Sequence, residues 1–396
     1  MKTNIRKNYQ LTVYACYIAY IVQGIVNNVN PILFTIYSKR LGITLDRIGW
    51  LIAANFGIQI MIDLAAAKYV DKIGYRICIV GAHIFVIFGL IGIGCSVMFG
   101  THAFLGVFIS TLLNGVGGGL LEVLVSPIVE AAPSEEKDKA MSMLHSFYCW
   151  GCVGFIAIST GMLHFMGESN WNMLPIAWAV IPLFNILAFL YVPVGALVEE
   201  EERISIKVLC RQKIFWQLVL LMVCAGASEM AMSQWASYFA ENGLSVSKQM
   251  GDIFGACFFC FMMGLSRLFY GRNGEKIPLQ QFMLYSCLLC VFGYCIAVFS
   301  PYAILGLIGC GICGLSVGIL WPGSYSIAAK ECKAGGTALF AILALAGDLG
   351  CITGPEVVSL IATATPRYGL RAGLFVAIVF PVLMLIGVLR VKEKGR

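Results

Sequence analysis

The feature that most constrains this chain is a series of apolar segments, each about 20 residues long, which recurs from one end to the other. A segment of that length crosses the hydrocarbon core of a bilayer as a helix, and we count about twelve of them. Lipid offers the backbone no hydrogen-bond partners, so only helices or closed barrels can span it. The alternating ten-residue strands of a barrel are missing. The sequence therefore predicts an all-α polytopic membrane protein with twelve transmembrane helices.

The positive charges fix the orientation. With both termini cytoplasmic, only six of the 27 Lys and Arg lie on the opposite side. These are Lys39, Arg40, Arg47, Lys248, Arg367 and Arg371. Such a bias sets topology, so the net charge of +6 indicates membrane orientation and not nucleic-acid binding. We expect a multi-pass protein of the plasma membrane, in a bacterium the cytoplasmic membrane, with both termini cytoplasmic.

The predicted helices fall into two groups of six. The first group is expected near 9–37, 48–69, 77–99, 103–129, 140–165 and 173–192. The second is expected near 215–239, 251–270, 279–299, 303–328, 337–364 and 372–389. Four consecutive glutamates, at 199–202, lie in the charged connector between the groups. We therefore predict an N-terminal bundle at 1–195, a cytoplasmic linker at 196–213 and a C-terminal bundle at 214–396, pseudo-symmetric with a cavity between them.

The sixteen cysteines do not indicate a metal site or a disulfide framework. Nearly all lie inside apolar segments, including four C-x-x-C pairs. On a helix, three-residue spacing places both thiols on one face, where cysteine acts as a small hydrophobic residue. A zinc site needs polar loops and further ligands. We expect no metal and no cofactor.

The turns after the second and eighth predicted helices carry a related motif. The first reads AKYVDKIGYR, at 67–76, and the second reads RLFYGRNGEK, at 267–276. The first resembles the signature loop of the major facilitator superfamily, with Ala67 where the family has glycine. The residues that carry the resemblance and its echo include Asp71, Lys72, Gly74, Arg76, Arg267 and Arg272. The resemblance implies two rocking bundles, with these residues making contacts that break as the bundles move.

Four further stretches resemble the fucose-permease-like branch of sugar:proton symporters. They are NNVNPIL, GGGLLEVLVSP, LHSFYCWG and WPGSYSIAAK. The resemblance implies that Glu122 handles substrate and proton. Pro31 stands where the branch has its helix 1 aspartate, so that second acidic site is missing here.

Glu122 is also the leading site residue on physical grounds. An ionisable group at membrane depth is costly and is expected to face a partner or a water-filled cavity. At helical spacing Asn114, Gly118 and Ser126 share its face. Gly115 and Gly119 form a small-xxx-small pair that allows another helix to approach closely.

Other polar groups lie within the predicted spans. Asn27, Asn28 and Asn30 flank Pro31, which favours a helix break and a binding surface. Asn55, Gln59 and Asp63 recur every four residues, as do Glu229, Ser233 and Ser237. Asp348 lies between glycines, His145 is alone on its helix, and Trp321 could stack on a sugar ring. The candidate substrate- or proton-binding set is Glu122, Asn27, Asn28, Asn30, Asn114, Glu229, Asp348, His145, Gln59 and Trp321.

The polar set also limits the solute. No Lys or Arg lies clearly within the hydrocarbon core, which favours a neutral or cationic solute over an anion. The sequence predicts a monomeric transporter that moves a sugar or polyol by alternating access, coupled to protons because burial disfavours a charged carboxylate. The alternative is a proton-coupled exporter of cationic or amphipathic compounds. An enzyme is not expected, since no nucleophile–base pair is recognisable. A phosphate-binding Gly-x-x-x-x-Gly-Lys-Ser/Thr loop is absent.

Overall fold

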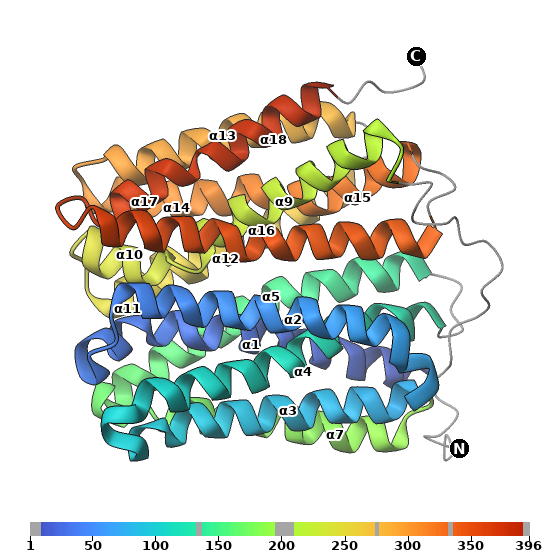
Figure 1. Cartoon of the computed structure of the whole chain (residues 1–396), viewed down its shortest axis with the longest axis horizontal. Coiled ribbons are helices and arrows are strands. Elements are labelled where there is room, and N and C mark those ends of the chain that lie inside the picture. Colours follow the sequence, from blue (N-terminus) through green and yellow to red (C-terminus); the bar gives the residue numbers. More distant parts are fainter. Residues whose placement is uncertain (1–8, 132–136, 195–209, 274–276, 332–335, 391–396) are drawn as a thin grey trace. The chain divides into compact units, whose positions relative to one another are not determined.

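The computed structural model describes residues 9–131, 137–194, 210–273, 277–331 and 336–390, and all regular structure in these ranges is helical (Figure 1). Eleven described stretches are long and apolar enough to cross a membrane. One of them, Tyr75–Val125, holds two crossings, because a 3-10 turn with Gly100 at φ 53° interrupts it. The prediction of an all-α fold with twelve transmembrane helices is confirmed.

The chain divides into two compact units. The first contains residues 1–47 and 54–199, and the second contains 48–53 and 200–396. Most of the predicted linker at 196–213 lies outside the described residues. Each unit is therefore described by itself.

The first unit is a bundle in which α4 (Ala103–Ala131) packs against several neighbours. Its other helices are α1 (Tyr9–Leu41), α2 (Leu45–Ile73, apart from residues 48–53), α3 (Tyr75–Cys95), α5 (Lys137–Met166), α6 (Met173–Trp178) and α7 (Val180–Tyr191). Two 3-10 turns, Ser96–His102 and Glu168–Asn170, join α3 to α4 and α5 to α6.

Glycines set the spacing around α4. A Cβ at Gly115 would lie 2.7 Å from the Asn55 carbonyl oxygen, and one at Gly119 would lie 3.1 Å from the backbone of Gln59. Both contacts are with α2, so the predicted small-residue pair does bring a second helix close. Gly117, which lies between these two glycines in the sequence, packs in the same manner against α3. These contacts fix which face of α4 carries Glu122.

The second unit consists of helices that differ widely in length. They are α9 (Lys213–Ser233), α10 (Ala236–Gly243), α11 (Lys248–Met250), the π-helix η4 (Gly251–Cys257), α12 (Phe258–Asn273), α13 (Leu279–Phe299), α14 (Ala303–Val317), α15 (Leu320–Glu331), α16 (Gly336–Ala364), α17 (Leu370–Ala377) and α18 (Val379–Arg390). Helices α9 and α16 lie side by side, because Gly226, Gly350 and Gly354 let the two backbones meet.

The helix interruptions differ from those expected. Pro31 lies inside α1, which continues unbroken from Tyr9 to Leu41, so the predicted break there is wrong. Neighbouring helices can satisfy backbone groups that a proline leaves open within a membrane. Instead the expected helices at 215–239 and 303–328 are interrupted, at Gln234–Trp235 and at Gly318–Ile319.

The first signature turn makes a specific backbone contact. Gly74 adopts φ 97°, which a residue with a side chain rarely does, and it ends α2 as the motif predicts. The Arg76 guanidinium donates to the carbonyl oxygens of Phe189 and Val192, at 2.5 and 2.8 Å. These carbonyls belong to the C-terminal end of α7, where a cation is favourable. Lys72 is exposed. The side chain of Asp71 lies outside the described residues.

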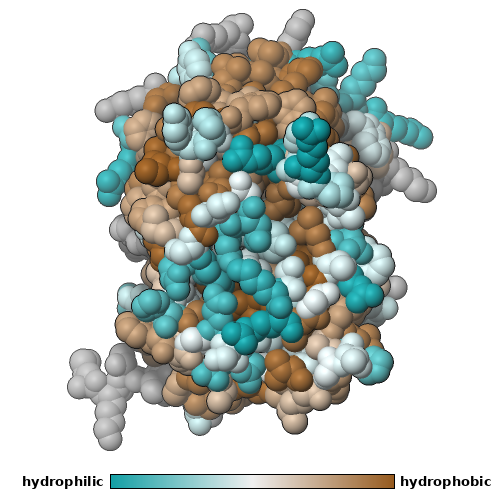
Figure 2. All heavy atoms as spheres, turned by 90° about the vertical axis from the view of Figure 1, so that its left-hand side faces the viewer, coloured by the Kyte–Doolittle hydropathy of each residue, from teal (hydrophilic) through white to brown (hydrophobic). Residues whose placement is uncertain are grey.

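Much of the surface is apolar. On α7, Leu183, Phe184, Leu187 and Leu190 are exposed at helical spacing, and α13 exposes Tyr285, Leu288 and Phe292 in the same way. Figure 2 shows one end of the molecule, where hydrophilic side chains gather and apolar side chains form much of the outline. Apolar flanks are what a bilayer requires of a spanning bundle.

Candidate functional site

The first unit contains a hydrogen-bonded group of amides around Glu122. The Gln23 amide nitrogen on α1 donates to Gln59 Oε1 on α2 at 3.1 Å, and to Glu122 Oε2 on α4 at 3.3 Å. These three residues come from three helices. A Cβ at Gly118 would meet both glutamines, so the glycine leaves the space that they fill.

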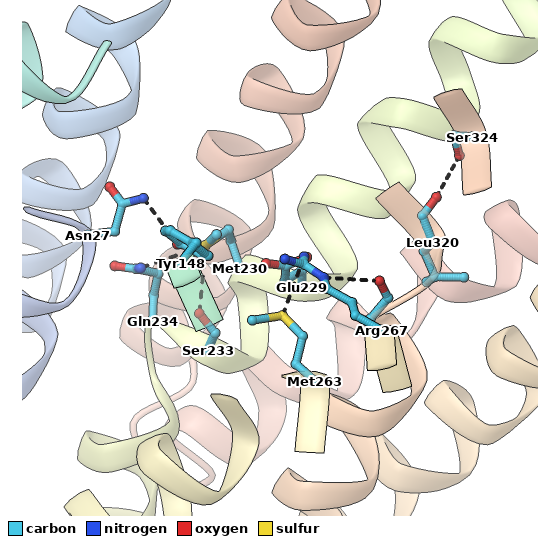
Figure 3. Close-up of polar contacts among 11 residues, drawn as sticks. Asn27, Tyr148, Glu229, Met230, Ser233, Gln234, Met263, Arg267, Leu320 and Ser324 are labelled. Atoms are coloured by element: carbon cyan, nitrogen blue, oxygen red, sulfur yellow. Dashed lines mark hydrogen bonds and ion pairs between the residues drawn. The ribbon is translucent and has the colours of Figure 1, made fainter. Parts of the chain in front are cut away.

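A second set of contacts lies one helical turn along α1. The Asn27 amide nitrogen donates to the Tyr148 hydroxyl of α5 at 3.2 Å (Figure 3), and Asn55 on α2 donates to Asn27 Oδ1 at 3.4 Å. Gln23 and Asn27 are four residues apart, as are Asn55 and Gln59, so paired turns of α1 and α2 supply the amides. We call Gln23, Gln59, Glu122, Asn27, Asn55 and Tyr148 the amide network.

The amide network keeps unused hydrogen-bonding capacity. Gln23 Oε1, Asn55 Oδ1 and Gln59 Nε2 are buried and have no hydrogen bond with the described residues. An unsatisfied buried polar atom costs about 1–3 kcal/mol, so water or a bound hydroxyl would be favourable there. Glu122 and Tyr148 are only half-buried. The network can therefore be reached at its carboxylate and its phenol.

Two of the three predicted asparagines serve helix packing. Asn28 donates to the Gly24 carbonyl oxygen at 2.9 Å and to the Cys152 sulfur at 3.2 Å. Asn30 donates to Thr111 at 3.0 Å. The predicted triple-amide surface is therefore reduced to Asn27, because adjacent positions on a helix point in different directions.

Asn114 does not share the direction of Glu122. Its side chain is fully buried and packs against Gly89 of α3, whereas Glu122 meets α1. Eight residues at 3.6 per turn leave a rotation of about 80°, enough to move a side chain from one neighbouring helix to the next. The side chain of Ser126, predicted on the same face, lies outside the described residues.

His145 lies at the edge of this region. Its exposed ring meets the ring of Tyr20 edge-on, with centroids 5.4 Å apart. Tyr20 in turn lies 6.5 Å from the ring of Tyr148. Aromatic contacts thus connect His145 to the amide network.

The second unit holds a carboxylate and a guanidinium that face each other. Glu229 on α9 is 5% exposed, and its Oε2 lies 3.8 Å from Nη2 of Arg267 on α12 (Figure 3). The same arginine donates from Nε to the Gly318 carbonyl oxygen at 3.3 Å, and its Nη2 lies 3.8 Å from the Met263 sulfur. Gly318 lies in the interruption between α14 and α15. Arg267 therefore joins three transmembrane elements.

This ion pair corrects one expectation from the sequence. The sequence groups Arg267 with the cytoplasmic loop charges and predicts no Lys or Arg clearly inside the membrane. The structure places Arg267 within the spanning stretch Lys248–Asn273, and its side chain reaches a buried carboxylate. A long arginine side chain can carry its charge well away from its own backbone position. A guanidinium inside the membrane can pair with an anion, so the preference for a neutral or cationic solute no longer follows. Arg272, by contrast, is exposed.

Asp348 and Trp321 lie in the same unit as Glu229. Asp348 is buried on α16, the helix that packs against α9. Its neighbour Gly347 packs directly beneath the Trp321 indole, and Trp321 is half-buried. Gly347 therefore allows the Trp321 indole to pack against α16 at the residue directly before Asp348.

Ser237 does not share a helix with Glu229. It lies on α10, beyond the interruption, and donates to Asp252. Lys248 binds both oxygens of that aspartate at 3.0 Å, and both side chains are buried. The expected row of Glu229, Ser233 and Ser237 therefore ends at Ser233.

Two members of the amide network, Gln23 and Tyr148, are not among the residues that the sequence predicts. An amide four residues before Asn27 in an apolar segment is a signal that identifies Gln23. Tyr148 lies in the motif LHSFYCWG, but it does not belong to a row of polar residues at helical spacing. No cluster of three metal-binding side chains occurs among the residues described.

Comparisons with known proteins fit this architecture. A family profile described as the Major Facilitator Superfamily matches residues 16–355. The xylose transporter XylE from E. coli, inward open, aligns with a TM-score of 0.76 and 12% identity, covering 98% of each chain. A bacterial homologue of the human lysosomal transporter Spinster, inward-facing and occupied, aligns with a TM-score of 0.75 and 13% identity, covering 98% of this chain and 97% of that one. No curated protein sequence matches the chain.

Proposed function

Because the chain belongs to the Major Facilitator Superfamily, and is therefore a membrane transporter, we propose that it carries a small hydroxylated solute, a sugar or polyol, by alternating access with proton coupling. The observation that supports this most is the amide network. Buried amide atoms without partners match solute hydroxyls, which both donate and accept hydrogen bonds. The similarity of fold to a D-xylose-proton symporter agrees with this substrate class.

Glu122 is the proposed proton-binding group of the first unit. Its carboxylate accepts a hydrogen bond from the Gln23 amide. This amide is neutral, so the contact does not compensate the charge of an ionised Glu122. A protonated carboxyl costs less to enclose than a charged one, so a proton taken up by Glu122 favours closure of the loaded carrier. A charged Glu122 favours the open states in which water reaches it.

The remaining expectations belong to the same proposal. The protein acts as a monomer in the bacterial cytoplasmic membrane, with both termini cytoplasmic. The resemblance to the fucose-permease-like branch rests on the motifs in the first, fourth, fifth and tenth predicted helices. The exporter of cationic compounds is less well supported, because Glu229 has Arg267 beside it and is not an uncompensated acid.

A flux experiment tests the proposal. Purified protein is reconstituted into liposomes that contain unlabelled solute. Exchange of sugars, polyols and cationic dyes is then followed with and without a pH gradient. We expect exchange of at least one sugar or polyol, and accumulation when the outside is acidic. Accumulation of dyes alone would contradict the proposal and support the exporter.

A further inference from the structure

The pairing of Glu229 with Arg267 carries information about the solute. Both groups lie inside spanning helices, and their side chains are 7% and 18% exposed. At 3.8 Å the two atoms are too far apart for a hydrogen bond. The pair is thus close enough to cancel charge, yet its geometry is looser than that of a bidentate arginine–carboxylate contact.

Charge balance limits what this pair can do during transport. In the empty carrier one negative and one positive charge face each other. A proton on Glu229 would remove the negative charge that faces the buried guanidinium, which is costly in a low-dielectric interior. A solute carboxylate that arrived together with the proton would replace it. The pair then remains neutral overall in both the empty and the loaded carrier.

We propose that Arg267 is the binding group for a carboxylate on the solute, which would make the solute a polyhydroxy acid such as a sugar acid. The solute carboxylate takes the place of Glu229 beside the guanidinium, and one proton binds to the Glu229 carboxylate. No covalent bond is formed or broken. This inference rests on the proposed function, because it adds an acid group to the hydroxylated solute.

The surroundings of Arg267 suit this role. Its Nε is held by the Gly318 carbonyl oxygen, which the interruption between α14 and α15 makes available, and Met263 packs its sulfur against Nη2. These contacts fix the plane of the guanidinium without adding negative charge. Asp348, on α16, is a second buried carboxylate on a helix that packs against α9.

Matched pairs of solutes test the inference. Exchange and proton uptake are measured in liposomes for D-glucitol against D-gluconate and for D-galactose against D-galacturonate. We expect half-saturation for the acid at a concentration about tenfold lower than for its neutral counterpart, the gain of one charge-assisted contact. We also expect one additional proton per acid. Equal half-saturation with equal proton uptake would overturn the inference and leave the proposed function standing.

Variants locate the effect. Arg267→Gln is expected to weaken exchange of the acids about tenfold more than exchange of the neutral solutes. Arg390→Gln, an exposed arginine at the end of α18, is the matched control. In Glu229→Gln the acids are expected to keep their advantage over the neutral solutes and to lose the additional proton, with Glu168→Gln as the control. Equal losses for acids and neutral solutes in Arg267→Gln would contradict the inference.

Folding is controlled independently. Arg267→Lys keeps the charge but lacks the planar fork, and the acids are expected to bind it between wild type and Arg267→Gln. The double variant with Glu229→Gln and Arg267→Gln removes both charges and is expected to exchange neutral solutes only. If this double variant still prefers the acids, the inference is wrong. If wild-type protein exchanges neither acids nor neutral solutes, the proposed function fails together with it.

Discussion

Gln23 on α1 donates a hydrogen bond to Glu122 on α4, with 3.3 Å between Nε2 and Oε2. This contact places the carboxylate of one spanning helix against the amide of another. Removal of the amide would take away a donor that stabilises the charged form of Glu122. The same nitrogen also donates to Gln59, so one substitution disturbs contacts with two helices.

Replacement of Gln23 by leucine should therefore impair solute binding. Hydrogen bonds to charged groups contribute about 1.5–3 kcal/mol, so we expect the half-saturation concentration to rise about tenfold or more. Exchange kinetics in liposomes measure this. Gln281→Leu, an exposed glutamine on α13, is the control. Unchanged half-saturation in the Gln23 variant would show that the amide network does not bind the solute.

Arg76→Ala should destabilise the first unit. The substitution removes both hydrogen bonds to the C-terminal carbonyls of α7, and the expected loss is about 1–2 kcal/mol. Thermal unfolding monitored by size-exclusion chromatography in detergent measures it. Lys72→Ala, in the same turn but exposed, should leave the unfolding temperature unchanged. Equal effects of the two substitutions would argue against a capping role for Arg76.

Gly350→Ala should separate α9 from α16. An added Cβ would lie 2.1 Å from the Val223 carbonyl oxygen, and one of the backbones would have to shift. Overpacking of this kind costs about 1–3 kcal/mol. Gly154→Ala, where nothing lies within 4 Å, is the control and should be neutral or slightly stabilising. Thermal unfolding of the two variants distinguishes a packing glycine from an incidental one.

Lys248→Met should destabilise the protein more than removal of both members of the ion pair. The single substitution leaves the buried Asp252 without its cation, at a cost of about 3–5 kcal/mol. The double variant with Lys248→Met and Asp252→Leu removes both charges and should recover part of that loss. Yields of folded protein and unfolding temperatures measure the difference. A double variant less stable than the single one would contradict this account.

The sequence was sufficient for the fold because its signals are periodic and long. Apolar length predicted the spans, and the Gly115 and Gly119 spacing predicted the close approach of another helix to α4. Gly74 was recognisable because its turn requires a conformation that suits glycine. These features depend on residues that are close together in the sequence, so the sequence alone is enough to recognise them.

The site was harder to predict because it depends on direction and reach. Asn114 and Glu122 are eight residues apart, and the resulting rotation sends them to different helices. Arg267 lies far enough along α12 to be grouped with the loop charges, yet its side chain reaches Glu229. Pro31 does not interrupt its helix, whereas Gly318 and Trp235, without any proline beside them, lie at interruptions. Tertiary packing decides such points, and no local pattern contains it.

The central claim is that Glu122 couples proton movement to the solute. The most direct measurement compares wild-type protein with Glu122→Gln in liposomes, following both exchange at equal pH and accumulation driven by an acidic exterior. The account predicts that the variant still exchanges solute at equal pH and no longer accumulates it. Accumulation by the variant at the wild-type rate would contradict the claim.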